Sequence, residues 1–233
     1  MRGAAIVLLL LSTPLPAAEP VDLFSIDLMA ASPAGDAVAL ATNASPAAVL
    51  TVWWPSQGAR RTASFGHEEI DAILADAAVA DLAWSPDGRL LAVELVAREG
   101  DSAIALLDLA KPRGLAPVTI EGHDNLALPR WSPKGTELWA VHGDAPESGD
   151  EDETGGIFRL DVRSRQVTRI LENVWVSDFR VSGTTVTALV EGDEAEDGSV
   201  LGKLIRVDLK TGARETIFQQ RSAPSGRRGV ISL

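Results

Sequence analysis

Two groups of acidic residues are the densest sets of potentially reactive side chains in this 233-residue sequence. Carboxylate oxygens are the ligands that calcium prefers, and clustered carboxylates also attract basic partners. Neither group has the Asp-x-Asp-x-Asp-Gly spacing of a calcium loop, so we interpret them as a solvated acidic face and keep calcium binding as the alternative. The candidate interaction face consists of Asp144, Glu147, Asp150, Glu151, Asp152, Glu153, Asp193, Glu194, Glu196 and Asp197.

The sequence contains none of the catalytic motifs that we considered. It contains no G-x-S-x-G nucleophile elbow and no cysteine, which excludes disulfides, thiolate metal sites and cysteine catalysis. Its three histidines, His67, His123 and His142, lack the i, i+4 spacing of a helical zinc site. We therefore expect a protein that is not an enzyme, and we assign no catalytic residue, cofactor or metal ligand.

Residues 1–18 have the pattern of a secretory signal peptide. Arg2 precedes an apolar run over residues 4–11, and prolines and alanines follow it. The run is too short to span a bilayer, which takes about 20 residues, although an uncleaved anchor is the alternative interpretation. We expect residues 19–233 to be periplasmic or secreted, without stable membrane insertion. No cysteine is present to carry a lipid anchor.

The charge balance narrows the class of partner. The chain has 33 acidic and 21 basic residues, a net charge of -12. Nucleic-acid binding depends on Lys and Arg neutralising phosphates, and anionic membrane surfaces also attract basic segments. We therefore expect a protein partner and no nucleic acid.

Five serines recur at a nearly constant spacing. Ser32, Ser85, Ser132, Ser182 and Ser232 are separated by 53, 47, 50 and 50 residues. A period of this length is typical of stacked supersecondary units that bury their faces against one another. Three of the serines share a turn motif, which reads Ala-Ser-Pro-Ala-Gly at 31–35, Trp-Ser-Pro-Asp-Gly at 84–88 and Trp-Ser-Pro-Lys-Gly at 131–135.

Each repeat is expected to contain four strands. In the second repeat, strands are predicted over Val79–Trp84, Arg89–Leu95, Ala103–Leu109 and Ala116–Ile120, and the first two flank the Pro-Asp-Gly turn. The corresponding third strands are predicted over Val49–Trp54, Ile157–Val162 and Leu204–Leu209. Four antiparallel strands per repeat are typical of a β-propeller blade, so the predicted fold class is an all-β propeller.

The motifs resemble a known type of propeller blade. The run Trp-Ser-Pro-Asp-Gly-Arg-Leu-Leu-Ala at 84–92, with Leu107-Asp108-Leu109 later in the repeat, is similar to the WD-repeat-like blade of TolB-type propellers. The same blade type forms the amino-terminal propeller of prolyl-oligopeptidase-like proteins. The resemblance covers about residues 22–220. It implies that Asp108, Asp161 and Asp208 occupy one blade position, where repeat one has Trp54.

The repeats do not add up to a whole number of blades. Blades are expected at about residues 22–66, 79–121, 126–172 and 175–220, and residues 229–233 have the phase of a fifth opening strand. That segment either closes a four-bladed ring or is the stub of an open, incomplete array. A short helix is predicted over residues 67–77, and Trp84 and Trp131 are expected to pack between blades.

The sequence supports two hypotheses about function. The first is a secreted or periplasmic, non-enzymatic propeller that serves as a protein-binding or assembly module. The alternative is the propeller part of a prolyl-oligopeptidase-like serine peptidase that lacks its hydrolase domain.

Overall fold

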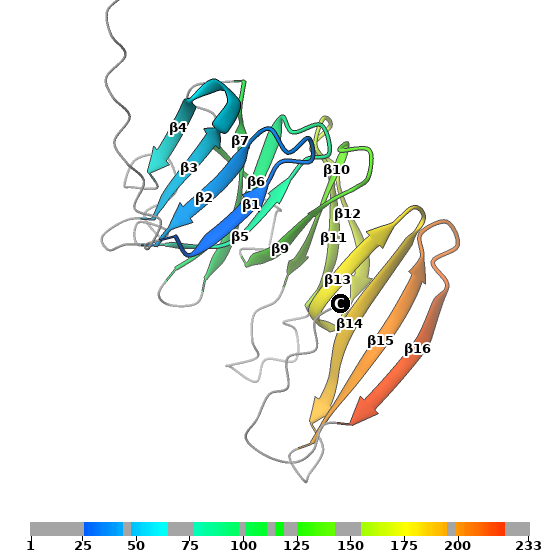
Figure 1. The fold of residues 1–233 in the computed structure, drawn as a ribbon. Coiled ribbons are helices and arrows are strands. Elements are labelled where there is room, and N and C mark those ends of the chain that lie inside the picture. Colours follow the sequence, from blue (N-terminus) through cyan, green and yellow to red (C-terminus); the bar gives the residue numbers. More distant parts are fainter. Residues whose placement is uncertain are drawn as a thin grey trace, which may run out of the picture.

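The computed structural model describes residues 26–43, 48–64, 77–97, 101–110, 115–118, 125–142, 155–194 and 199–221. These residues form four separate four-stranded antiparallel sheets, and in each sheet neighbouring strands are consecutive in the chain (Figure 1). The predicted all-β propeller fold is therefore confirmed. In this part of the chain no helix is long and apolar enough to cross a membrane.

The four sheets are named blades one to four in chain order. Blades one and two contain β1 Leu28–Ala31, β2 Val38–Thr42, β3 Val49–Trp54, β4 Ala59–Ser64, β5 Ala78–Trp84, β6 Leu90–Val96, β7 Ser102–Asp108 and β8 Leu115–Val118. Blades three and four contain β9 Leu126–Trp131, β10 Glu137–His142, β11 Gly156–Asp161, β12 Val167–Glu172, β13 Trp175–Ser182, β14 Thr185–Glu194, β15 Val200–Asp208 and β16 Arg214–Arg221.

The repeated serine closes the hairpin between the first two strands of a blade. In blade two, Gly88 has a φ of +68° and its N–H donates to the carbonyl of Ser85 at 2.9 Å. The buried Ser85 hydroxyl accepts the backbone N–H of Leu90 at 2.9 Å and donates to the Asp87 carboxylate at 2.6 Å. The same serine contact recurs from Ala37 N–H to Ser32 Oγ at 3.1 Å and from Glu137 N–H to Ser132 Oγ at 3.2 Å.

The hairpin of blade four is shorter, as its sequence suggests. Ser182 pairs directly with Thr185, so only Gly183 and Thr184 form the turn. Gly183 still has a positive φ, of +59°. The loss of the Pro-Asp-Gly motif thus changes the length of the turn but not the pairing of the two strands.

The aspartate that ends the third strand caps the turn into the fourth. Asp161 Oδ1 accepts the N–H groups of Arg163 and Ser164, at 3.0 and 2.7 Å, and Asp208 does the same for Lys210 and Thr211. The hydrogen bond from Ser164 is the main reason why the pKa of Asp161 lies below its ordinary value. Blade one, which has Trp54 here, turns instead through a 3₁₀ turn over Pro55–Gln57.

The core is divided among the interfaces between consecutive blades. One apolar cluster lies between blades one and two, a second between blades two and three, and a third between blades three and four. Each cluster is built from alternate residues of both sheets, because successive side chains of a strand point to opposite faces. The core is divided in this way because the repeats stack, as the sequence predicts, and bury their faces against one another.

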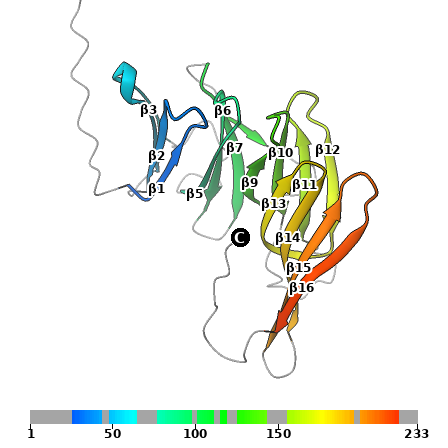
Figure 2. The ribbon, with the colours of Figure 1, turned by 45° about the vertical axis from the view of Figure 1, so that its right-hand side comes forward.

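The described blades form an open array. The first strands pack in sequence, β1 with β5, β5 with β9, and β9 with β13. Blades one and four lie at opposite ends of the array in both views (Figures 1 and 2). Residues 229–233, whose closing role was one of the two alternatives, lie outside the described residues, as does the helix predicted over residues 67–77 except for Ala77.

Candidate functional site: a charged clamp on the inner strands

Two tryptophans join neighbouring blades through hydrogen bonds. Trp84 Nε1–H donates to the carbonyl of Ala30 at 3.0 Å, and Trp131 Nε1–H donates to the carbonyl of Ala83 at 2.9 Å. Each indole therefore links the first strand of its blade to the first strand of the preceding blade. The prediction that these two side chains pack between blades is confirmed.

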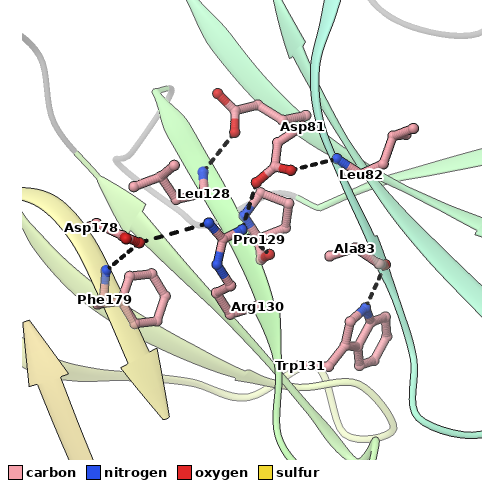
Figure 3. Close-up of polar contacts among 10 residues, drawn as sticks. Asp81, Leu82, Ala83, Leu128, Pro129, Arg130, Trp131, Asp178 and Phe179 are labelled. Atoms are coloured by element: carbon pink, nitrogen blue, oxygen red, sulfur yellow. Dashed lines mark hydrogen bonds and ion pairs between the residues drawn. The ribbon is translucent and has the colours of Figure 1, made fainter. Parts of the chain in front are cut away.

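A charged cluster extends the same connection across three blades. Arg130 of β9 lies between Asp81 of β5 and Asp178 of β13 (Figure 3). Its Nη1 is 2.5 Å from Asp81 Oδ2, and its Nη2 is 3.8 Å from Asp178 Oδ1. We call Asp81, Glu94, Arg130 and Asp178 the inner-strand clamp.

The two aspartates of the clamp are held in the same way. Asp81 Oδ1 accepts the N–H of Leu82, and Asp178 Oδ1 accepts the N–H of Phe179, both at 2.8 Å (Figure 3). In both strands the pairing register shifts immediately before the aspartate. A β-bulge redirects side chains locally, so the repeated bulge orients both carboxylates.

Glu94 is the buried member of the clamp. Only 7% of it is exposed, and its Oε2 accepts the N–H of Leu128 at 2.7 Å, across the interface of blades two and three. Burial raises the pKa of Glu94, and the nearby Asp81 raises it further, whereas the Leu128 N–H and Arg130 oppose the shift.

The clamp places one cationic side chain among three carboxyl groups. Arginine stays protonated, so Arg130 acts as a fixed cation that two carboxylates approach from different blades. In the part of the chain that the structure describes, no group of three or more metal-ligating side chains is arranged around one position. Arg130 links blade three to blade two and to blade four through these ion pairs.

Most of the acidic face predicted from the sequence cannot be compared with this geometry. Asp193 and Glu194 belong to β14, where Glu194 pairs with Val200, so they extend a hairpin and do not form a loop. Calcium binding and a basic partner at the acidic face stay predictions. The residues of that face outside the described ranges are Asp144, Glu147, Asp150, Glu151, Asp152, Glu153, Glu196 and Asp197.

His142 is the one histidine within the described residues. His142 is buried at the end of β10, and its ring meets that of Phe158 edge to face, with 5.8 Å between centroids. His67 and His123 lie outside the described residues.

The clamp residues were missed by the sequence reasoning, although two signals point to them. Asp81 and Asp178 each lie four residues before a repeated serine, which an alignment of the repeats brings together. Glu94 is the one charged residue within the apolar strand Leu90–Val96. Arg130 has no such signal, because its role depends on two neighbouring blades.

Comparison with known proteins agrees with this fold. The family described as "Lipoprotein LpqB beta-propeller domain" matches residues 64–201. The solved structure of TolB from Acinetobacter baumannii aligns with a TM-score of 0.52 and 16% identity, over 81% of this chain and 42% of that one. The β-propeller domain of the Trilobed protease from Pyrococcus furiosus, which has an open velcro topology, gives 0.58 and 15%, over 83% and 56%.

A putative TolB from Agrobacterium tumefaciens aligns with a TM-score of 0.54 and 17% identity, over 82% of this chain and 64% of that one. At these identities the likeness shows the fold alone. This chain spans less than two thirds of the length of each of the three solved structures. No curated protein matches it by sequence.

Proposed function

Because this chain belongs to the family of the lipoprotein LpqB β-propeller domain, we propose that it is an extracytoplasmic, non-enzymatic β-propeller that serves as a binding or assembly module. The lipoprotein in the family's description supports a location outside the cytoplasm. The signal-peptide pattern of residues 1–18 supports the same compartment.

The observation that carries this proposal is an apolar row on blade four. Leu189, Leu204 and Phe218 lie directly opposite one another on β14, β15 and β16. We call these three residues the end row. They lie on the face of blade four that points away from blade three, since the alternate residues Val186, Ala188 and Val190 pack into the third cluster.

The equivalent rows of the earlier blades are buried beneath the next blade. The centre of the row is four positions before the end of the third strand, and Leu50, Ile104 and Ile157 occupy it in blades one to three. All three are fully buried, whereas Leu204, which occupies this position in blade four, is only partly buried. On the fourth strands, Val118 and Leu171 pair with Ile104 and Ile157 and are buried. Phe218, which pairs with Leu204 in the same way, is 55% exposed. The row is therefore apolar in blade four too, although no described residue covers it there.

An uncovered row of this kind favours association. Full burial of a large apolar side chain stabilises a folded state by about 1.5–3 kcal/mol relative to exposure. Exposed apolar patches on soluble proteins mark interaction surfaces, and this row lies on a rigid sheet. We propose that a partner covers the end row in the assembled state.

Photocrosslinking in the cells that make the protein tests this proposal. A photoreactive amino acid replaces Phe218, and in a matched control it replaces Gln219, the next exposed residue of β16, whose side chain points to the opposite face. Crosslinked protein products are expected in the exported fraction at position 218 and not at position 219. Equal products at both positions, or none at 218, would contradict the proposed assembly role.

The peptidase hypothesis is favoured by the likeness to the propeller of the Trilobed protease, which concerns the fold. A panel of peptidase and esterase substrates separates it from a non-enzymatic module. We expect no turnover above that of a heat-denatured sample. Turnover that a single substitution abolishes would establish an enzyme.

A further inference from the structure

We propose that Glu94 is a pH-sensitive latch at the interface of blades two and three, which holds the Leu128 segment of β9 when its carboxyl is protonated and releases it when the carboxyl is ionised. Glu94 belongs to β6 of blade two, and Leu128 belongs to β9 of blade three. Such a latch would act on the inner-strand clamp and is independent of the partner at the end row.

Two carboxyl groups of the clamp lie directly opposite each other. Asp81 of β5 and Glu94 of β6 are paired residues in the antiparallel register of blade two. Residues paired in this way have Cβ atoms only about 4.5–5.5 Å apart, and like charges there are destabilising. Asp81 carries the ion pair with Arg130 and is partly exposed, whereas Glu94 is 7% exposed. The cost of charging both groups therefore falls on the buried one, Glu94.

The groups around Glu94 come from three strands. β5 presents Asp81, and β9 presents Arg130 and the Leu128 N–H, whose nitrogen is 2.7 Å from Glu94 Oε2. β7 presents the paired residue Ile104, which is apolar and fully buried. Burial is the main cause that raises the pKa of Glu94, and Asp81 adds to it, against the opposing effects of the N–H and Arg130. The closed interface thus favours the protonated carboxyl.

Leu128 is the strained residue that the latch holds. Its φ of +52° lies in the left-handed region, which costs free energy for a residue with a β-carbon. The pairing register between β9 and β10 shifts at this point, so Leu128 and Pro129 fall between the paired residues of the two strands. A strained conformation persists only where its surroundings hold it. The hydrogen bond from the Leu128 N–H to Glu94 is such a hold, and it comes from another blade.

Release of Leu128 would reach the neighbouring blades through Arg130. Arg130 follows two residues later, and its Nη1 donates to the Pro129 carbonyl at 2.9 Å, so the guanidinium is tied to this segment (Figure 3). The same guanidinium forms both ion pairs of the clamp, of which the one to Asp178 reaches blade four. The Leu128 side chain also packs against the cluster shared with blade four. One proton on Glu94 is therefore coupled to two interfaces.

Release should increase as the pH rises. When Leu128 is released, Glu94 meets water and its pKa returns toward the ordinary value of 4.5, below the raised value of the closed state. The released state therefore binds the proton less tightly than the closed state does. Raising the pH from 4.5 through the raised pKa favours release, and lowering the pH restores the latch.

Amide hydrogen exchange tests the latch. The full chain, labelled with 15N and 13C, is followed by NMR between pH 4.5 and pH 8, and the exchange rate of the Leu128 N–H is compared with its intrinsic rate at each pH. We expect the protection of this amide to fall at least about threefold over this range. The amide of Leu50, a fully buried residue of β3 in blade one, is the internal control and should not follow the same change.

Glu94→Gln is the matched variant, because its side-chain oxygen can accept the Leu128 N–H and does not ionise. In this variant the protection of the Leu128 amide should stay constant across the pH range. An equal fall in Glu94→Gln would overturn the proposal. An equal fall at Leu50 in the wild type would also overturn it, because it would show a loss of global stability instead of a local release.

A second measurement needs no variant. The 13C shift of the Glu94 carboxyl follows its ionisation in the wild-type chain. The loss of protection at Leu128 should level off at the pH where this carboxyl has become ionised, because release no longer changes its charge above that point. A carboxyl that is already fully ionised at pH 5, or protection that continues to fall after its ionisation is complete, would overturn the latch.

Discussion

The interface between blades two and three and the interface between blades three and four solve the same packing problem with different groups. In the first, Trp131 of the later blade donates a hydrogen bond to Ala83 of the earlier one. In the second, Val181 occupies the position of that tryptophan and has no hydrogen-bond donor on its side chain. The indole is contributed instead by the earlier blade, as Trp139, which is 1% exposed and packs in the third cluster.

The two indoles have different roles. Trp131 is partly buried and its N–H is paired, whereas the buried Nε1–H of Trp139 has no acceptor among the described residues. An unpaired buried donor costs free energy, and the volume that Trp139 fills offsets that cost. Blade four, which has Val181 at the position of the tryptophan, still stacks on blade three because apolar packing replaces the hydrogen bond.

The strongest way to break the third interface is to remove its apolar centre. Phe179 is fully buried there, so Phe179→Ala should destabilise the chain by about 3–5 kcal/mol, through lost transfer free energy and the cavity that remains. Urea denaturation followed by circular dichroism measures this. Gln219→Ala, at an exposed position, should change stability by no more than about 0.5 kcal/mol, and an equal loss in both variants would contradict the role of packing.

Substituting each indole sharpens the contrast between the interfaces. Trp131→Phe leaves the Ala83 carbonyl without its donor and should cost about 1–3 kcal/mol. Trp139→Phe also removes volume, but it removes an unpaired donor, so its cost should be smaller, at less than about 1 kcal/mol. Thermal unfolding of the two variants decides the order. A larger loss for Trp139→Phe would show that the packing it removes from the third cluster outweighs the hydrogen bond that Trp131→Phe removes.

The clamp is a polar feature that both interfaces share. Arg130→Met keeps the apolar stem and removes the charge, and we expect a loss of about 1 kcal/mol because the partners are partly exposed. Double-mutant cycles with Asp81→Asn and Asp178→Asn measure how much of this loss comes from the coupling of Arg130 to each aspartate. The coupling to Asp81, at 2.5 Å, should exceed the coupling to Asp178, at 3.8 Å, and the reverse order would contradict the geometry.

The smallest expected effect concerns Glu94 and depends on pH. Because its pKa in the folded chain lies above the ordinary value of 4.5, the folded state binds the proton more tightly than the unfolded state does. Its contribution to stability is therefore complete below pH 4.5 and decreases as the pH rises through the raised pKa.

Glu94→Gln keeps an acceptor for the Leu128 N–H and removes this ionisation. The melting temperature of the variant relative to the wild type should therefore rise from pH 4 to pH 8. Asp161 and Asp208, whose pKa values are lowered, are present in both proteins and cancel in the comparison. A constant difference across this range would show that Glu94 titrates normally.

Much of the fold could be predicted because its signals are local. The Ser-Pro-Asp-Gly turn, the alternating strands and the aspartate at the end of the third strand act within a few residues of one another, so the second repeat was predicted to within two residues at every described strand end. The candidate site could not be predicted in this way. Asp81, Arg130 and Asp178 are separated by about 50 residues each, and only stacking brings them together.

The sequence by itself determined the repeat, the four-stranded blade and the turns, because strand periodicity and turn chemistry depend on neighbouring residues. The tertiary structure alone decided which charges meet, which carboxyl group is buried, and which apolar rows remain uncovered. The physical reason is that burial of a sheet face depends on contacts between blades that lie about 50 residues apart in the chain. Whether Ile157 or Phe218 is buried depends on what packs against its sheet, which no single repeat encodes.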